Sequence, residues 1–77
     1  MEHFLHLRLK QLRKKHKIPQ KRLAEKLGIQ PRSYRFYESG GRYPDFEGLL
    51  KLANFYHVSL DYLVGWSNDE SINKKTL

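Results

Sequence analysis

The 77-residue sequence contains no cysteine, which excludes disulfide bonds and thiolate-ligated metals as sources of stability. Its longest runs of contiguous apolar residues hold only two or three residues, far short of the roughly 20 that a membrane-spanning helix needs. The first ten residues, MEHFLHLRLK, contain no apolar core of a secretion signal. We therefore expect a cytoplasmic protein without a membrane partner, built as one small domain from helices with local contacts.

Charge is present in excess of one sign and is unevenly placed. Lysine and arginine outnumber aspartate and glutamate by 15 to 8, a formal net charge of +7. Residues 1–42 carry 12 basic and 3 acidic side chains, a net charge of +9, whereas residues 43–77 carry 3 and 5, a net charge of −2. This asymmetry favours a polyanionic partner. A basic surface that only promotes solubility is the alternative.

Residues 20–39, QKRLAEKLGIQPRSYRFYES, contain two short apolar patterns with helical spacing. Leu23 and Leu27 lie four residues apart, which places them on one face of a first helix. Tyr34 and Tyr37 lie three residues apart on one face of a second helix. We expect both tyrosines in the core with their hydroxyls at the surface, where one of them can meet a phosphate.

Two small residues between these patterns favour a tight turn. Gly28 can adopt a positive φ, which lets the first helix end and the second begin almost at once. Ala24 leaves room for two helix backbones to cross closely. The sequence therefore predicts a helix-turn-helix, in which a shared core face directs the second helix outward.

Three further helices are predicted around this unit. Residues 4–15 carry Leu5, Leu9 and Leu12 as a buried stripe. Asp45 and Ser59 are good N-caps for helices over residues 46–56 and 60–64. The buried face of the former is expected to contain Phe46, Leu49, Leu52, Ala53 and Tyr56. We expect residues 1–66 to form the domain and residues 67–77 a mobile polar tail.

The segments RLKQLRKKHKIPQKRLAEKLGI, YESGGRYPDFEGLLKLA and VSLDYLVG together resemble the Cro and phage-repressor, or Xre-type, helix-turn-helix family. The resemblance covers about residues 5–65. It implies a compact all-α domain of five helices, with the helix-turn-helix formed by the second and third. It also implies a bacterial or phage transcriptional regulator, most often a repressor. Its partner would be double-stranded operator DNA, bound as a homodimer on a palindromic site, with no cofactor.

The resemblance makes residues 31–38 the recognition helix in the major groove. The implied DNA contacts are Gln20, Lys21, Gln30, Pro31, Arg32, Ser33, Arg35, Phe36, Arg42 and Tyr43. Arg32 and Arg35 are the best base readers, because a guanidinium can donate to two acceptors on guanine. Phe36 either touches a thymine methyl group or is partly core. Phosphate contacts are expected from the first two and the last two residues of the set.

The family pattern also places an internal ion pair between Arg13 and Glu38, which we interpret as structural. The sequence departs from that pattern at four positions, one of which is Phe36, apolar where many relatives carry a polar reader. Pro19 replaces a capping serine or threonine, and Pro31 offers no hydrogen-bond donor. Gly41 replaces a common lysine or arginine and so removes one expected phosphate contact.

One recognition helix buries only about 600–1,000 Å² on DNA, which is little for tight specific binding. A two-fold dimer on half-sites about one helical turn apart, roughly 34 Å, removes this limit. Candidate dimer contacts are the apolar residues of the last two predicted helices and their surroundings: Phe46, Val58, Tyr62, Val64 and Trp66. Trp66 alternatively closes the core behind the last helix.

Other functions have less support. The sequence shows no cysteine, no acid pair in a recognisable pocket and no phosphate-cradling glycine loop, so we do not expect an enzyme. His3 and His6 lie three residues apart but lack an evident third ligand, so we expect no metal site. A protein-interaction module or antitoxin with an unknown partner is the alternative. Pro31 and Phe36 would suit such a partner, whereas the basic half of the chain favours DNA.

Overall fold

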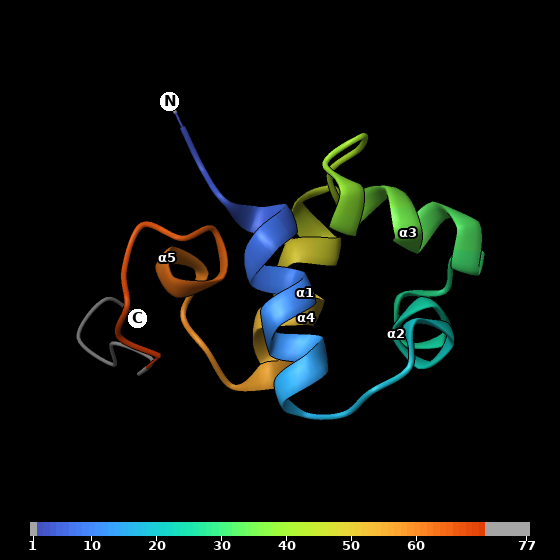
Figure 1. Ribbon diagram of the computed structural model, residues 1–77, viewed down its shortest axis with the longest axis horizontal. Helices are drawn as coiled ribbons and strands as arrows, with labels where there is room; N and C mark the ends of the chain where they lie inside the picture. The colour runs from blue at the N-terminus through green and yellow to red at the C-terminus, as the bar shows by residue number, and fades with distance from the viewer. Residues whose placement is uncertain (1, 71–77) are drawn as a thin grey trace.

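Five helices form the structure, a computed structural model that describes residues 2–70 (Figure 1). They are α1 (Leu5–Lys15), α2 (Gln20–Leu27), α3 (Pro31–Ser39), α4 (Phe46–Tyr56) and α5 (Leu60–Leu63). No strand occurs between residues 2 and 70. The expected all-α, five-helix fold is confirmed, and the predicted helix ends differ from the observed ones by at most one residue.

Local chemistry explains where the two central helices stop and start. Gly28 follows α2 with φ 71° and ψ 31°, the left-handed conformation that a side chain disfavours. Its backbone N–H caps the last turn of α2. Pro31 then opens α3 at the first helical position, where no N–H is needed. Gly40, with φ 84°, ends α3 in the same left-handed way.

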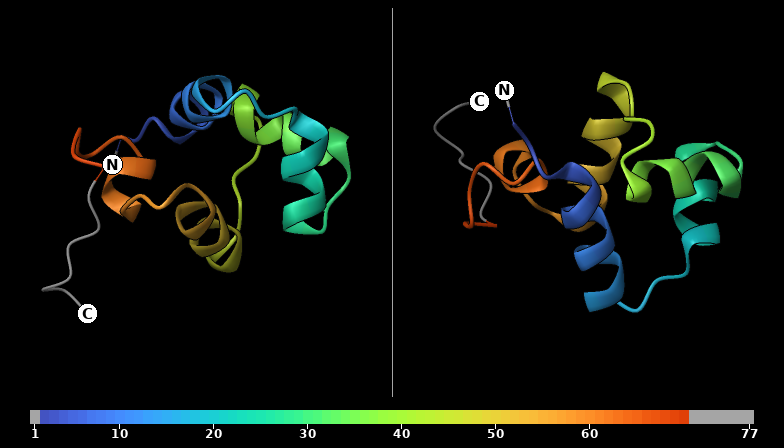
Figure 2. Two further views of the ribbon diagram at one scale, coloured as in Figure 1. Left: turned by 90° about the horizontal axis from the view of Figure 1, so that it is seen from below. Right: turned by 45° about the horizontal axis from the view of Figure 1, so that its top comes forward.

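The core joins all five helices around α1, which lies in the middle of the view in Figure 1. α1 contacts α3 and α5, and α2 contacts α3 and α4. Figure 2 shows α2 and α3 together at one end of the molecule and α5 at the other. Leu9, Leu23, Tyr34 and Leu63 are completely buried. Ala24 is also completely buried, as the predicted close helix crossing requires.

Several predictions about burial are wrong. Phe46, expected on the buried face of α4, has 68% of its surface exposed because it is the first residue of that helix and lies beyond the core layer. The Tyr34 hydroxyl, expected at the surface, is buried where α3 packs on α1. Val58 and Tyr62, expected at a dimer interface, are core residues of the single chain. α5 packs on α1, and the Arg8 guanidinium lies 3.8 Å from the centre of the Tyr62 ring.

The chain after α5 stays against the domain at least to residue 70. Nη2 of Arg8 donates to the carbonyl oxygen of Ser67 at 3.4 Å. Nζ of Lys15 lies 3.0 Å from a carboxylate oxygen of Glu70. Residues 67–70, expected to belong to a mobile tail, therefore contact the domain, and the rest of the expected tail, residues 71–77, lies outside the described part of the chain. No helix between residues 2 and 70 has the length and apolarity that crossing a bilayer demands.

Candidate nucleic-acid interface

The outward face of α3 carries the side chains expected to read DNA. Gln30, Arg32, Arg35 and Phe36 are exposed, and Pro31 and Ser33 are partly buried. The helical period explains the division, because Tyr34 and Glu38 are four residues apart and turn inward together. Arg32 and Arg35 are three residues apart and share the opposite side. The N-cap and the first two turns of α3 therefore present an amide and two guanidinium groups.

A buried polar network fixes α3 against the rest of the domain. Nε and Nη2 of Arg13 donate to the two carboxylate oxygens of Glu38 at 2.6 and 3.1 Å. Nη1 of Arg13 donates to the carbonyl oxygen of Ile18 at 3.1 Å, and Nε2 of Gln20 donates to Glu38 at 3.2 Å. The side chains of Arg13 and Glu38 are 16% and 5% exposed. The network joins α1, the start of α2 and α3, so it fixes the orientation of α3 relative to α1 and α2.

The electrostatics of Glu38 follow from these contacts. Burial disfavours the carboxylate, but the hydrogen bonds from Arg13 and Gln20, with the nearby Tyr34 hydroxyl, outweigh it. The pKa of Glu38 is therefore below its ordinary value. Burial raises the pKa of the Tyr34 hydroxyl, which stays neutral at physiological pH. The Gln20 amide thus supports α3 from the start of α2, where a DNA phosphate contact was also expected of it.

Phe36 lies at the edge of this face and contacts the loop that follows α3. Phe36 is 40% exposed, so it is a surface residue that is partly covered. The guanidinium carbon of Arg42 lies 5.2 Å from the centre of the ring, within cation–π range. Phe36 and Arg42 were expected to contact DNA separately, and their spacing in the sequence gives no signal of this contact.

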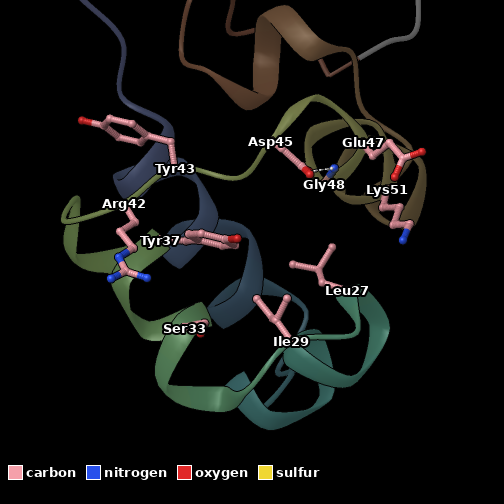
Figure 3. Close-up of a pocket in the computed structure, with 10 residues that line it drawn as sticks. All are labelled: Leu27, Ile29, Ser33, Tyr37, Arg42, Tyr43, Asp45, Glu47, Gly48 and Lys51. Atoms are coloured by element: carbon pink, nitrogen blue, oxygen red, sulfur yellow. Dashed lines mark hydrogen bonds between the residues drawn. The ribbon is translucent and has the colours of Figure 1, made fainter.

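A hollow lies beside α3, between α3, the end of α2 and the start of α4 (Figure 3). Leu27, Ile29 and Tyr37 point into it from the helix-turn-helix. Glu47 and Lys51 line it from α4, where they give the rim both signs of charge. The mixed charge makes this hollow a poorer surface for a polyanion than the outward face of α3.

The loop between α3 and α4 places two further expected contacts at the surface. Arg42 and Tyr43 are both exposed. The Tyr43 ring meets the edge of the His3 ring, with centroids 4.8 Å apart and planes at 77°. The His6 ring packs against Gly40, at 3.5 Å from the position of a Cβ built there. Across residues 2–70, no three His, Cys, Asp or Glu side chains are grouped closely enough for a metal ion.

Three of the five expected dimer contacts remain available at the surface. Phe46 is 68% exposed and Trp66 is 54% exposed, whereas Val64 is partly buried. The indole Nε1 of Trp66 donates to the backbone oxygen of Glu2 at 2.7 Å. This bond ties the segment after α5 to the start of the chain, and the Trp66 ring stays outside the core that it was alternatively expected to close.

Comparisons with known proteins match both the sequence and the fold. A family model described as Helix-turn-helix matches residues 9–63. The HTH-type transcriptional regulator ImmR of Bacillus subtilis (strain 168) is 46% identical over 68 residues, which are 88% of this chain and 51% of ImmR. The chain spans about half the length of the curated relatives that it matches.

Two solved structures share the arrangement of the helices. A transcriptional regulator from Listeria innocua superposes with a TM-score of 0.83 at 36% identity, covering 99% of this chain and 70% of that one. The P22 c2 repressor, solved in complex with a synthetic operator, superposes with a TM-score of 0.75 at 30% identity. That match covers 83% of this chain and 97% of the repressor.

Proposed function

This chain belongs to the helix-turn-helix family of DNA-binding transcriptional regulators that its residues 9–63 match, and we propose that it represses transcription by binding a palindromic operator as a homodimer. Its role is binding rather than catalysis, because the family and the relatives are regulators. We place this activity in the cytoplasm of a bacterial cell, in keeping with its bacterial relatives.

The observation that carries the proposal is the exposed outward face of α3, over its first two turns, on a rigid support. Arg32 and Arg35 project from the same side of α3, and the network around Glu38 holds the helix from beneath. A guanidinium can donate two hydrogen bonds to O6 and N7 of guanine in the major groove. Gln30, at the N-cap of α3, can pair with adenine or fix a phosphate. Pro31 and Ser33 then lie close to the sugars and base edges.

Phosphate contacts fix the position of α3 along the groove. Lys21 and Gln20 begin α2, while Arg42 and Tyr43 follow α3, so the two pairs flank the recognition helix. Contacts of this kind supply affinity without reading sequence. The charge of +9 on residues 1–42 supports the same orientation, because the basic half contains both α2 and α3.

Dimerisation supplies the second recognition helix. Phe46 and Trp66 are the exposed apolar residues proposed for the contact between copies, with Val64 beside Trp66. They belong to the half of the chain with a net charge of −2, so pairing there does not bring the two basic surfaces together. We propose an association that is weak in solution and completed on DNA.

A protein partner is the second candidate function, and one observation favours it. The match covers only about half of each relative's length, and the exposed Phe46 and Trp66 are apolar surfaces that another protein can cover. The apolar Phe36 supports this reading less, because Arg42 covers part of its ring.

Selection of DNA sites from a random pool tests the proposal directly. We expect enrichment of a palindrome whose half-sites are about one helical turn, roughly 34 Å, apart. Enrichment of a single half-site would retain DNA binding and reject the dimer. A pool that never enriches, while nonspecific DNA is bound no better than by a protein of similar charge, would favour the protein-partner function.

A further inference from the structure

Phe36 and the loop of residues 40–42 form one packed unit at the end of α3. The carbonyl oxygen of Phe36 accepts hydrogen bonds from the backbone N–H of Gly41 at 3.0 Å and of Arg42 at 3.3 Å. The Ser39 hydroxyl donates to the same oxygen at 3.2 Å. The backbone of Phe36 therefore anchors the turn that reverses the chain after α3.

The side chain of Phe36 meets the same loop. Its ring lies under the Arg42 guanidinium, with 5.2 Å between the guanidinium carbon and the ring centre. A Cβ atom on Gly41 would lie 3.1 Å from Cδ1 of Phe36, which is closer than ordinary van der Waals contact. A side chain at position 41 would therefore need the Phe36 ring to shift by a few tenths of an ångström, and Gly41 lets the ring stay where it is.

The Arg42 side chain lies beside α3. Figure 3 shows the Arg42 side chain running back along α3, at the rim of the hollow between α3 and α4 that it helps to line. A guanidinium held by a cation–π contact can still donate N–H hydrogen bonds to another group. Arg42 is therefore held beside the recognition face with donors available for a phosphate.

We propose that Phe36 is a positioning residue for Arg42: its ring holds the guanidinium beside α3, and Gly41 leaves room for that ring. The proposal rests on the function proposed above and deepens it. Arg42 contacts the DNA backbone as a fixed extension of the recognition helix, and Phe36 contributes to binding through Arg42 instead of through a thymine methyl group. Holding the arginine in place before binding reduces the side-chain entropy lost on the DNA.

A double-mutant cycle on the selected operator tests the proposal. Phe36→Leu and Arg42→Ala are each expected to weaken binding by about fivefold, and the double variant is expected to be no weaker than Arg42→Ala alone. Phe36→Tyr keeps an aromatic face and should retain full affinity. Gly41→Ala should weaken binding in the wild-type background but not in the Phe36→Leu background, where the smaller side chain can give way.

If the losses of affinity caused by Phe36→Leu and Arg42→Ala multiply in the double variant, the proposal is overturned. Phe36 would then contact DNA independently of Arg42. A second measurement on the free protein separates this outcome from a failure to bind DNA. Ring current from Phe36 should move the NMR signals of the Arg42 δ protons upfield, and Phe36→Leu should abolish that shift. Absence of the shift in the folded wild-type protein also overturns the proposal, whereas its presence without any operator binding would reject the proposed function instead.

Discussion

Nε of Arg13 on α1 lies 2.6 Å from Oε2 of Glu38 on α3, and a second hydrogen bond of 3.1 Å makes the pair bidentate. The two residues are 25 positions apart in the chain. Gln20 adds a third donor from α2. The pair therefore connects the helix that crosses the core to the helix proposed to read DNA, and its integrity determines how α3 is presented.

Removing one partner of this pair should destabilise the domain strongly. Arg13→Met leaves the Glu38 carboxylate buried with Gln20 as its remaining hydrogen-bond donor among the side chains described. We expect the free energy of unfolding to fall by about 3 kcal/mol, because an unpaired buried charge is costly. Urea unfolding followed by circular dichroism measures this change.

Two companion variants make the result specific. Arg13→Met combined with Glu38→Leu replaces the pair by apolar groups and should recover most of the lost stability. Lys15→Met removes the exposed pair with Glu70 and should leave the urea midpoint unchanged. A loss in Arg13→Met no greater than that in Lys15→Met would contradict a structural role for the buried pair.

Stability should depend on pH through Glu38. Its pKa in the folded protein lies below the ordinary value of 4.5, because hydrogen bonds from Arg13 and Gln20 outweigh the effect of burial. A lowered pKa means that its contribution is complete above about pH 4.5 and is lost as the pH falls through the folded value. The difference in unfolding free energy between wild type and Glu38→Gln should therefore shrink below pH 4.5. A difference that stays constant with pH would contradict this assignment.

Much of the fold was predictable because its signals are local. Gly28 ends α2 in the left-handed conformation that glycine adopts readily. Asp45 and Ser59 cap α4 and α5 with their own side chains. Those caps accept hydrogen bonds from Gly48 N at 2.8 Å and Tyr62 N at 3.0 Å. Residues that depend on their immediate neighbours in the chain were thus placed correctly.

The wrong predictions concern which side chains are buried and which are exposed, because that depends on how the helices pack against one another. Val58 turns inward after His57, which ends α4 with a φ of 55° although it is not glycine. Tyr62 is covered because α5 packs on α1, and Phe46 is uncovered because α4 extends past the core. The Phe36–Arg42 contact likewise depends on the path of the loop. Periodicity within one helix contains no information about these arrangements.

The salt dependence of DNA binding should distinguish lysines that contact a phosphate from lysines that do not. Lys21, at the start of α2, is proposed to meet a phosphate, so Lys21→Ala should reduce the log–log slope by about one unit per chain. Lys26 lies on the same helix, with its ammonium 5.9 Å from the centre of the Phe55 ring, and serves as a matched control. Equal reductions in slope for Lys21→Ala and Lys26→Ala would contradict the proposed orientation.

Trp66 should report on the association of two chains. It is the only tryptophan in the sequence and is 54% exposed in the single chain. Burial between two copies should shift its fluorescence emission to shorter wavelength when a full palindromic site is added. A half-site, which binds one chain, should leave the emission unchanged. The same spectrum on both DNAs would place the dimer contact elsewhere.

The central claim is that Arg32 and Arg35 on α3 read base edges. The most direct measurement is the ratio of operator affinity to nonspecific affinity for Arg32→Lys and Arg35→Lys, which keep the charge but lose the two-pronged donor. The account predicts that each variant reduces this ratio by about tenfold or more while nonspecific binding stays unchanged. An undiminished ratio in both variants would contradict it, and would show that α3 does not read the sequence through these arginines.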